Sequence, residues 1–299
     1  MSGKIFEMRG RVKIQKINRN GAYTVMVNGK VFPQLEQVIE DVGEAGCRLA
    51  EMNACEGTSG MISVYMGYPV DPGSLFTQEE KIQLAEPAPY LVNGTVLFSG
   101  FGRRLRDILK HPAENLGLVK INEDGLTGTL FTSPTKAFSR LSADFSSYIS
   151  IHQNQVQANG DQYHAVVQAR PHYITYLSEI TKYQDQVYLN KHLLRWQADL
   201  VSEFADGIGV LPFLVLGSHG LMKSTIKSFQ QHRFLVWSKH GVIARDSNSV
   251  LSVVDLIEMI ESGAQYEYLN LINHELADGL TTEEIEASNR AKGVRHSIY

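Results

Sequence analysis

The sequence has few of the features that mark a specialised class of protein. It contains only two cysteines, Cys47 and Cys55, and no Cys-x-x-Cys pair, which argues against a disulfide scaffold and fits a reducing compartment. No apolar run reaches the roughly 18 residues of a membrane-spanning helix, and the first residues lack the apolar core of a secretion signal. We therefore expect a cytoplasmic protein.

A strong charge of either sign is also missing. The formal net charge is −4 and the pI is about 6.2, so the chain has no field that would gather nucleic acid or an anionic membrane. At 299 residues the chain is near the upper size of a single hydrophobic domain. We expect one domain with a small appendage, and a small molecule as its ligand.

Hydrophobic periodicity divides the chain into three parts. Residues 1–32 alternate apolar and polar positions around turns and predict an N-terminal β-hairpin extension. Residues 33–278 form the main domain and 279–299 a C-terminal tail. Strands are expected at 61–66, 91–98, 117–122, 127–132, 166–168, 210–213 and 234–238, and helices at 33–53, 142–157, 173–180, 193–203, 218–232 and 247–274. Residues 67–90 are expected to be a loop.

The stretch 165–176 is the most informative part of the main domain. It is an apolar strand that ends in polar side chains and passes through a proline into a helix. Gln168 and Arg170 occupy alternate positions, so the two-residue period of a strand points them to the same side. Polar side chains at a strand end are where α/β folds usually bind ligands.

Four separated motifs carry a family resemblance. They are Ser-Gly-Phe-Gly at 99–102, Pro-Ala-Glu-Asn-Leu-Gly-Leu-Val-Lys at 112–120, Gly-Ile-Gly-Val-Leu-Pro at 207–212 and Val-Trp-Ser-Lys-His-Gly at 236–241. In this order they resemble the class II aldolase/adducin family, and most closely its ketose-1-phosphate aldolases, over about residues 35–275. The resemblance implies an α/β single domain with a central, mostly antiparallel sheet flanked by helices. It also implies a homo-oligomer, a tetramer with sites at subunit boundaries.

The same resemblance implies a catalytic apparatus that this sequence alters. Family members hold zinc with three histidines and move a proton with a glutamate. Gln168 and Arg170 stand at the first two zinc-ligand positions, and only His240 matches the third. Asp144 falls at the acid/base position in a gap-free alignment, while a second register would place Arg140 there.

The family's phosphate-binding turns are altered as well. The resemblance implies substrate or anion binding at Gly60, Ser63, Ser99, Gly100, Gly102 and Ser142. Backbone amides of such glycine turns can cradle an anion. Met61 and Phe101, however, replace small polar residues, which predicts a more apolar or bulkier ligand, or none.

These replacements weaken the expectation of zinc. A guanidinium is always protonated and offers no lone pair, so Arg170 cannot be a ligand and would repel a dication. We therefore expect no zinc cofactor. One hypothesis is that Arg170 itself supplies the positive charge, with Asp144 as base and His240 as acid, in a lyase or isomerase acting on a small oxygenated substrate, sugar-phosphate-like or carboxylate.

Two alternatives stay open. Arg170 and Asp144 could form a structural ion pair in a catalytically inactive binding or scaffold protein. The chain could instead be a genuine zinc-dependent ketose-1-phosphate aldolase, if the alignment at the ligand positions is different from the one given above. Separately, His164 and His172 could rebuild a metal site with His240.

Overall fold

The computed structural model describes residues 12–16, 23–27, 29–141, 145–274 and 276–295. Their main feature is a nine-stranded sheet in the order β10-β11-β12-β9-β4-β6-β7-β8-β5. Only the β10–β11 pair is parallel, which confirms a mostly antiparallel sheet. Its strands are β4 (Met61–Met66), β5 (Gln78–Gln83), β6 (Thr95–Ser99), β7 (Leu116–Ile121), β8 (Thr127–Thr132), β9 (Tyr163–Ala169), β10 (Gly209–Leu211), β11 (Phe234–Trp237) and β12 (Gly241–Asp246).

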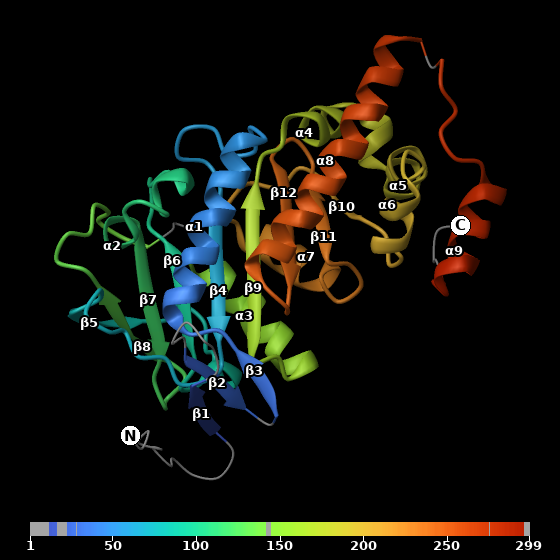
Figure 1. Ribbon diagram of the computed structural model, residues 1–299. Coiled ribbons are helices and arrows are strands. Elements are labelled where there is room, and N and C mark those ends of the chain that lie inside the picture. Colours follow the sequence, from blue (N-terminus) through green and yellow to red (C-terminus); the bar gives the residue numbers. More distant parts are fainter. Residues whose placement is uncertain (1–11, 17–22, 28, 142–144, 275, 296–299) are drawn as a thin grey trace.

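Helices cover both faces of this sheet (Figure 1). Helices α1 and α8 pack side by side on one face, and α3 and α7 contact each other on the other. This arrangement confirms the predicted α/β class. The helices are α1 (Leu35–Glu51), α2 (Pro112–Asn115), α3 (Phe145–Asn159), α4 (His172–Glu179), α5 (Gln186–Leu194), α6 (Ala198–Glu203), α7 (His219–Ser228), α8 (Val250–Ile272) and α9 (Thr282–Lys292).

Strand β9 lies in the middle of the sheet and explains its own apolar sequence. It pairs with β12 on one side and β4 on the other, and both of its faces are covered, so nearly every residue is buried. Val167 and Ala169 face the core beneath α1 and α8, and Val166 faces the core beneath α3 and α7. Alternation along the strand therefore places Gln168 and Arg170 on the α3 side.

The N-terminal extension is a separate three-stranded antiparallel sheet. It comprises β1 (Val12–Lys16), β2 (Tyr23–Val27) and β3 (Lys30–Phe32), which confirms the predicted hairpin or meander. Val25 and Val27 are buried in the core of the main domain. The Phe32 ring also stacks on Tyr68 with centroids 4.9 Å apart. The extension is thus packed on the domain.

Three expected elements differ from the structure. The predicted loop 67–90 contains β5, an exposed edge strand whose sequence, Gln-Glu-Glu-Lys-Ile-Gln, shows no apolar alternation. Strand β12 was not expected. It forms because Lys239 and Gly241, both with positive φ, turn the chain back directly after β11. The predicted helix 193–203 is two helices, α5 and α6, and α5 starts earlier because Asp185 accepts the Tyr188 backbone N–H at 2.8 Å.

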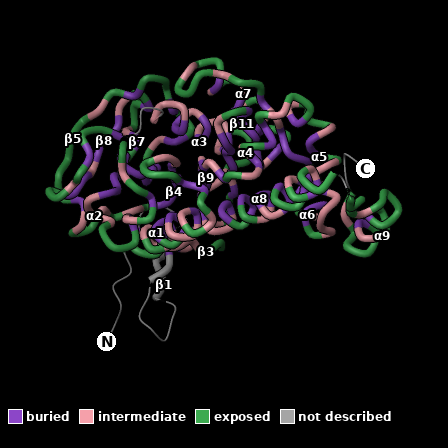
Figure 2. The backbone as a smooth tube through the Cα atoms, turned by 90° about the horizontal axis from the view of Figure 1, so that it is seen from above, coloured by how far each residue is buried: buried purple, intermediate pink, exposed green. Residues whose placement is uncertain are grey.

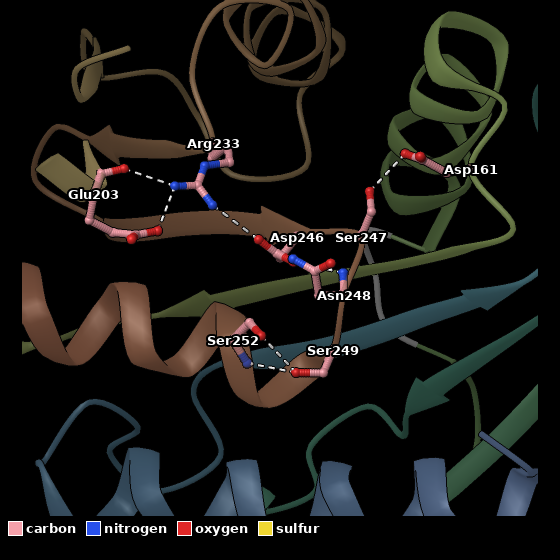
Figure 3. Close-up of polar contacts among 8 residues, drawn as sticks. All are labelled: Asp161, Glu203, Arg233, Asp246, Ser247, Asn248, Ser249 and Ser252. Carbon is pink, nitrogen blue, oxygen red and sulfur yellow. Dashed lines mark hydrogen bonds and ion pairs between the residues drawn. The ribbon is translucent and has the colours of Figure 1, made fainter. Parts of the chain in front are cut away.

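A polar network fixes β12 at its Asp246 end (Figure 3). Gln168, on the neighbouring strand β9, pairs with Ile243, closer to the other end of β12. The Arg233 guanidinium donates to Glu203 at 2.7 Å and to Asp246 at 3.2 Å. Ser247 donates to Asp161 at 2.8 Å. Ser249 then caps α8 by accepting the backbone N–H of Ser252. These bonds stabilise the segments that connect β11, β12 and α8. They lie at the opposite edge of the sheet from the C-terminal end of β9.

Burial follows the layers of the fold. Seen from above, buried positions run along the sheet and the inner sides of the helices, while the outer turns and most of α9 are exposed (Figure 2). Helix α9 is stabilised locally by a capping box between Thr281 and Glu284. Within the described part of the chain, no helix has the length and apolar character needed to cross a bilayer.

Candidate active site

A cavity opens at the C-terminal end of β9, where the sequence placed the polar pair. Its volume is about 200 Å³. Both Gln168 and Arg170 line it, so the structure brings this predicted pair together at one site. The other lining residues are Thr58, Ser59, Gly60, Met61, Ser99, Gly100, Phe101, Gly102 and Leu216.

Gly60 forms the wall of this cavity beside Gln168. Its φ is +89°, and a Cβ built there would lie 2.9 Å from Leu105 Cδ1 and 3.2 Å from the Gln168 carbonyl oxygen. Only glycine combines this backbone conformation with so close an approach. The chain thereby enters β4 directly against the end of β9.

The glycine turn after β6 forms a second wall. Gly100 donates its backbone N–H to the Asn115 carbonyl at 2.7 Å, and Phe101 donates its own to the Arg140 carbonyl at 3.2 Å. These two amides are therefore not available to cradle an anion. Ser99 is buried, and its Oγ accepts the Ile62 backbone N–H at 3.2 Å, which leaves its hydroxyl hydrogen as a donor.

Arg170 is the cation of the cavity. Its backbone N–H donates to the Ala54 carbonyl at 2.7 Å, which holds the chain where it leaves β9. Its Nε donates to the His240 carbonyl at 3.2 Å. Within the described ranges Arg170 forms no ion pair with a carboxylate. Nε is thus fixed by the protein, and the other two guanidinium nitrogens are the ones that can address a ligand.

His240 contacts the site through its backbone more than through its ring. Its Nε2 donates to the Leu214 carbonyl at 3.0 Å, and its ring packs against Phe213, tilted by 32°, with centroids 4.9 Å apart. The following Gly241 has φ +125°, and a Cβ there would lie 2.3 Å from the Ala169 carbonyl oxygen. His240 therefore anchors the 212–217 loop through its ring and orients Arg170 through its carbonyl.

The residues at the family's ligand positions do not fit zinc. Arg170 has no lone pair and repels a dication, and Gln168 offers a neutral amide oxygen in place of an imidazole. His240 could still offer Nδ1, because its hydrogen lies on Nε2, which donates to Leu214, but one histidine does not make a zinc site. In the part of the chain that the structure describes, no group of three His, Cys, Asp or Glu side chains is placed to hold a metal. The alternative of a rebuilt site also fails, because His172 pairs with Glu56 at 2.9 Å and His164 is buried beside Tyr65, at the other end of β9.

A buried polar chain lies in the layer behind the cavity. Ser63, a predicted anion-binding residue, is fully buried, and its Oγ lies 2.7 Å from His152 Nε2. His152 Nδ1 lies 2.8 Å from His164 Nδ1. Burial lowers the pKa of His152 to about 3 and that of His164 well below its usual value. Both rings are neutral, and the structure does not bring Ser63 to the cavity.

Among the predicted site residues, Gln168, Arg170, Gly60, Ser99, Gly100 and Gly102 line one cavity. His240 contacts it through Arg170. Ser142 and Asp144, the predicted base, lie outside the described residues. The contribution of Leu216 was missed, because its apolar loop carries no motif. His240 was the one indication in the sequence that this loop contributes, because its ring, at the end of a strand, packs against the loop residues Phe213 and Leu214.

Comparison with known proteins identifies the family of this chain. The model of the family described as "Class II Aldolase and Adducin N-terminal domain" matches residues 40–268. The chain belongs to the class II aldolase/adducin family. The rhamnulose-1-phosphate aldolase of Yersinia pseudotuberculosis serotype O:1b (strain IP 31758) is 27% identical to this family member over 195 residues, 64% of this chain and 68% of the relative.

Solved structures of the family share the fold at lower sequence identity. A sugar-phosphate aldolase from Thermotoga maritima has a TM-score of 0.66 and 20% identity, covering 79% of this chain and 96% of its own. An L-fuculose-1-phosphate aldolase from Thermus thermophilus has a TM-score of 0.51 and 14% identity, covering 82% and 100%. These likenesses show the aldolase/adducin fold.

Proposed function

We propose that this family member is a divergent lyase or isomerase that acts on a small oxygenated substrate, sugar-phosphate-like or carboxylate, and uses Arg170 in place of a metal ion. One observation carries the proposal. A guanidinium that forms no ion pair with a carboxylate among the described residues lines the cavity at the strand end where the family resemblance places zinc ligands.

The chemistry of arginine suits this role. Its planar fork binds a carboxylate, or the paired oxygens of an enediolate, through two parallel charge-assisted hydrogen bonds. A cation fixed before the reaction stabilises the negative charge that develops when a proton leaves a carbon next to a carbonyl group. Gln168 adds an amide that can donate to a substrate hydroxyl or carbonyl.

The proton transfer is assigned by family position. We propose Asp144 as the base that removes the proton. His240 receives a positioning role in place of the expected acid role, because its Nε2 hydrogen is engaged by Leu214. The side chains at the ligand positions do not fit zinc, so the proposed reaction uses protein groups alone. A zinc-dependent ketose-1-phosphate aldolase would need three zinc ligands where this chain has Gln168, Arg170 and His240. We therefore propose no metal cofactor.

A binding protein without catalysis is the second candidate. The bond from Arg170 Nε to the His240 carbonyl favours it, because this bond alone gives the arginine a structural use. Homo-oligomerisation, as a tetramer, is a further proposal that rests on the family resemblance. A cytoplasmic location is a proposal that rests on the composition of the sequence.

Thermal unfolding with a panel of sugar phosphates and hydroxycarboxylates, with and without a chelator, tests the proposal. We expect some anions to raise Tm, with no effect of chelator and a loss of the shift in Arg170→Gln. Lys182→Gln, which removes a surface cation on the segment after α4, is the matched control. A chelator-dependent Tm would support the zinc aldolase instead, and indifference to every anion would support the scaffold protein.

The proposed base has its own test. Asp144→Ala should abolish turnover of any substrate that the panel identifies, because no other group is assigned to remove the proton. Turnover that is unchanged in this variant would reject Asp144 as the base.

A further inference from the structure

We infer that the substrate of this cavity is a small carboxylate with an apolar substituent, its carboxylate bound by Arg170 and its apolar part held between Phe101 and Leu216. The inference deepens the proposed function and rests on the role of Arg170 stated there. It names one class among the small oxygenated substrates and disfavours phosphorylated sugars.

The lining of the cavity combines polar and apolar side chains. The polar ones are Thr58, Ser59, Ser99, Gln168 and Arg170, and the apolar ones are Met61, Phe101 and Leu216. Phe101 is 44% exposed and Leu216 is 39% exposed. Ligand sites commonly combine an apolar lining with a few convergent polar groups, and a ligand that matches this one needs a charged end and an apolar end.

The Phe101 ring is held in place before any ligand binds. The Arg140 guanidinium lies over it, 4.3 Å from the ring centroid. The backbone N–H of Phe101 donates to the Arg140 carbonyl at 3.2 Å, so the contact is supported from both the side chain and the main chain. A cation over one ring face fixes its orientation and leaves the other parts of the ring as an apolar surface.

Leu216 is presented by an anchored loop. His240 Nε2 donates to the Leu214 carbonyl at 3.0 Å. On the other side, the Ser218 backbone N–H donates to the Val215 carbonyl at 3.1 Å, and the Ser218 side chain caps α7. Leu216 is therefore held from both directions. A preorganised apolar contact improves affinity because less side-chain freedom is lost on binding.

Size and donor supply argue against a phosphorylated sugar. The cavity of about 200 Å³ is smaller than the roughly 300–1,000 Å³ of typical drug-sized pockets. The amides of Gly100 and Phe101 are already bonded to backbone carbonyls. A phosphate group would lack these two amides as donors and would lie beside the apolar Met61 and Phe101 surfaces, whereas one carboxylate matches the fork of Arg170.

Calorimetric titration of the full chain with two hydroxy acids tests the inference. The probes are glycerate and racemic 2-hydroxy-4-methylpentanoate, which share the carboxylate and the adjacent hydroxyl and differ in the substituent. We expect the branched acid to bind about tenfold more tightly, because burying about two carbon groups contributes that factor. Phe101→Ser and Leu216→Ser should remove this preference, and Arg170→Gln should weaken both acids.

The controls keep the outcomes distinct. Leu126→Ser alters a comparably exposed leucine in the turn before β8 and should leave the preference intact, and Phe101→Leu should keep most of it. Equal affinity for the two acids, still dependent on Arg170, would overturn the inference and leave the proposed function standing. Binding of neither acid would overturn the inference alone, and the thermal-unfolding panel of sugar phosphates and hydroxycarboxylates would then decide the proposed function. If the two acids bind equally and Leu216→Ser abolishes self-association of the chain, a second copy covers this surface, and the inference is overturned.

Discussion

The end of β9 shows how single residues decide the chemistry of this site. Arg170 cannot bind a metal, and it is held by a backbone carbonyl, so its position does not depend on the identity of the neighbouring side chain. That carbonyl belongs to His240. The neighbouring Gly241 in turn allows β12 to approach β9 closely enough for the bond to form.

Substitution of Gly241 tests this close approach. Gly241→Ala should destabilise the fold by about 1–3 kcal/mol, because the positive φ of this position strains alanine. A further loss should come from the clash between the new Cβ and the Ala169 carbonyl oxygen, which would lie 2.3 Å apart. Gly73→Ala is the matched control, since Gly73 also has a positive φ, +63°, but has open space around it. Urea denaturation measures both, and equal costs would contradict the clash.

The His240 ring has a separable role. His240→Ala removes the hydrogen bond to Leu214 and leaves the carbonyl that orients Arg170. We expect a loss of about 0.5–1.5 kcal/mol in unfolding free energy and faster hydrogen exchange in residues 212–217, with Arg170-dependent anion binding retained. Loss of anion binding without faster exchange in this loop would instead place the ring in the binding site.

At the scale of elements, α4 is positioned by a residue from α8. Helix α4 begins directly after Pro171 and has no side-chain N-cap of its own. The buried Glu261 accepts the backbone N–H groups of Tyr173 at 2.8 Å and Ile174 at 3.0 Å. Burial raises the pKa of Glu261, although these bonds act in the opposite direction. One carboxylate thus fixes the helix that follows Arg170.

Neutralising this cap should be costly. Glu261→Gln keeps the size of the side chain but replaces one acceptor oxygen with a donor that faces a backbone N–H, so we expect a loss of about 1–3 kcal/mol in unfolding free energy. Glu258→Gln on the same helix alters an exposed partner of Arg48 and should cost no more than about 1 kcal/mol. Chemical denaturation compares the two variants. Similar losses would show that the hydrogen bonds from Glu261 to α4 contribute no more to stability than an exposed ion pair.

At the scale of the whole molecule, the buried histidine pair links stability to pH. His152 has a pKa of about 3 in the fold, against 6.5 when exposed, and burial also lowers that of His164. Among the described residues, Ser63 and Tyr65 on β4 lie beside His152, and Arg245 on β12 further lowers the pKa of His164. None of these three carries a carboxylate that would compensate a proton on either ring.

Acid should therefore unfold the protein through these two groups. A histidine with a depressed pKa contributes stability that is complete above pH 6.5 and is lost as pH falls toward 3, because the unfolded chain takes up the proton. The loss is about 1.4 kcal/mol per pH unit for each histidine that stays neutral. Urea titrations from pH 7 to 4 measure it, with His219→Gln, an exposed site, as the control. A flat profile would contradict neutral burial.

The sequence predicted much of this architecture and less of the site. Periodicity located α1, β4, β7, β8 and α8, because each buries a clear apolar stripe or run. It missed β5, whose side chains are exposed on an edge and follow no pattern. Motif spacing found Gln168, Arg170 and the glycine turns, but it could not predict that the amides of Gly100 and Phe101 are occupied or that Ser63 is buried, since both depend on which distant residues become neighbours.

The central claim is that Arg170 replaces the metal of the class II aldolases. Elemental analysis of the full chain, purified without chelator and after addition of zinc and desalting, tests it most directly. The account predicts zinc far below one ion per chain in both samples, unchanged in His240→Ala. One tightly held zinc per chain, lost in His240→Ala, would contradict it.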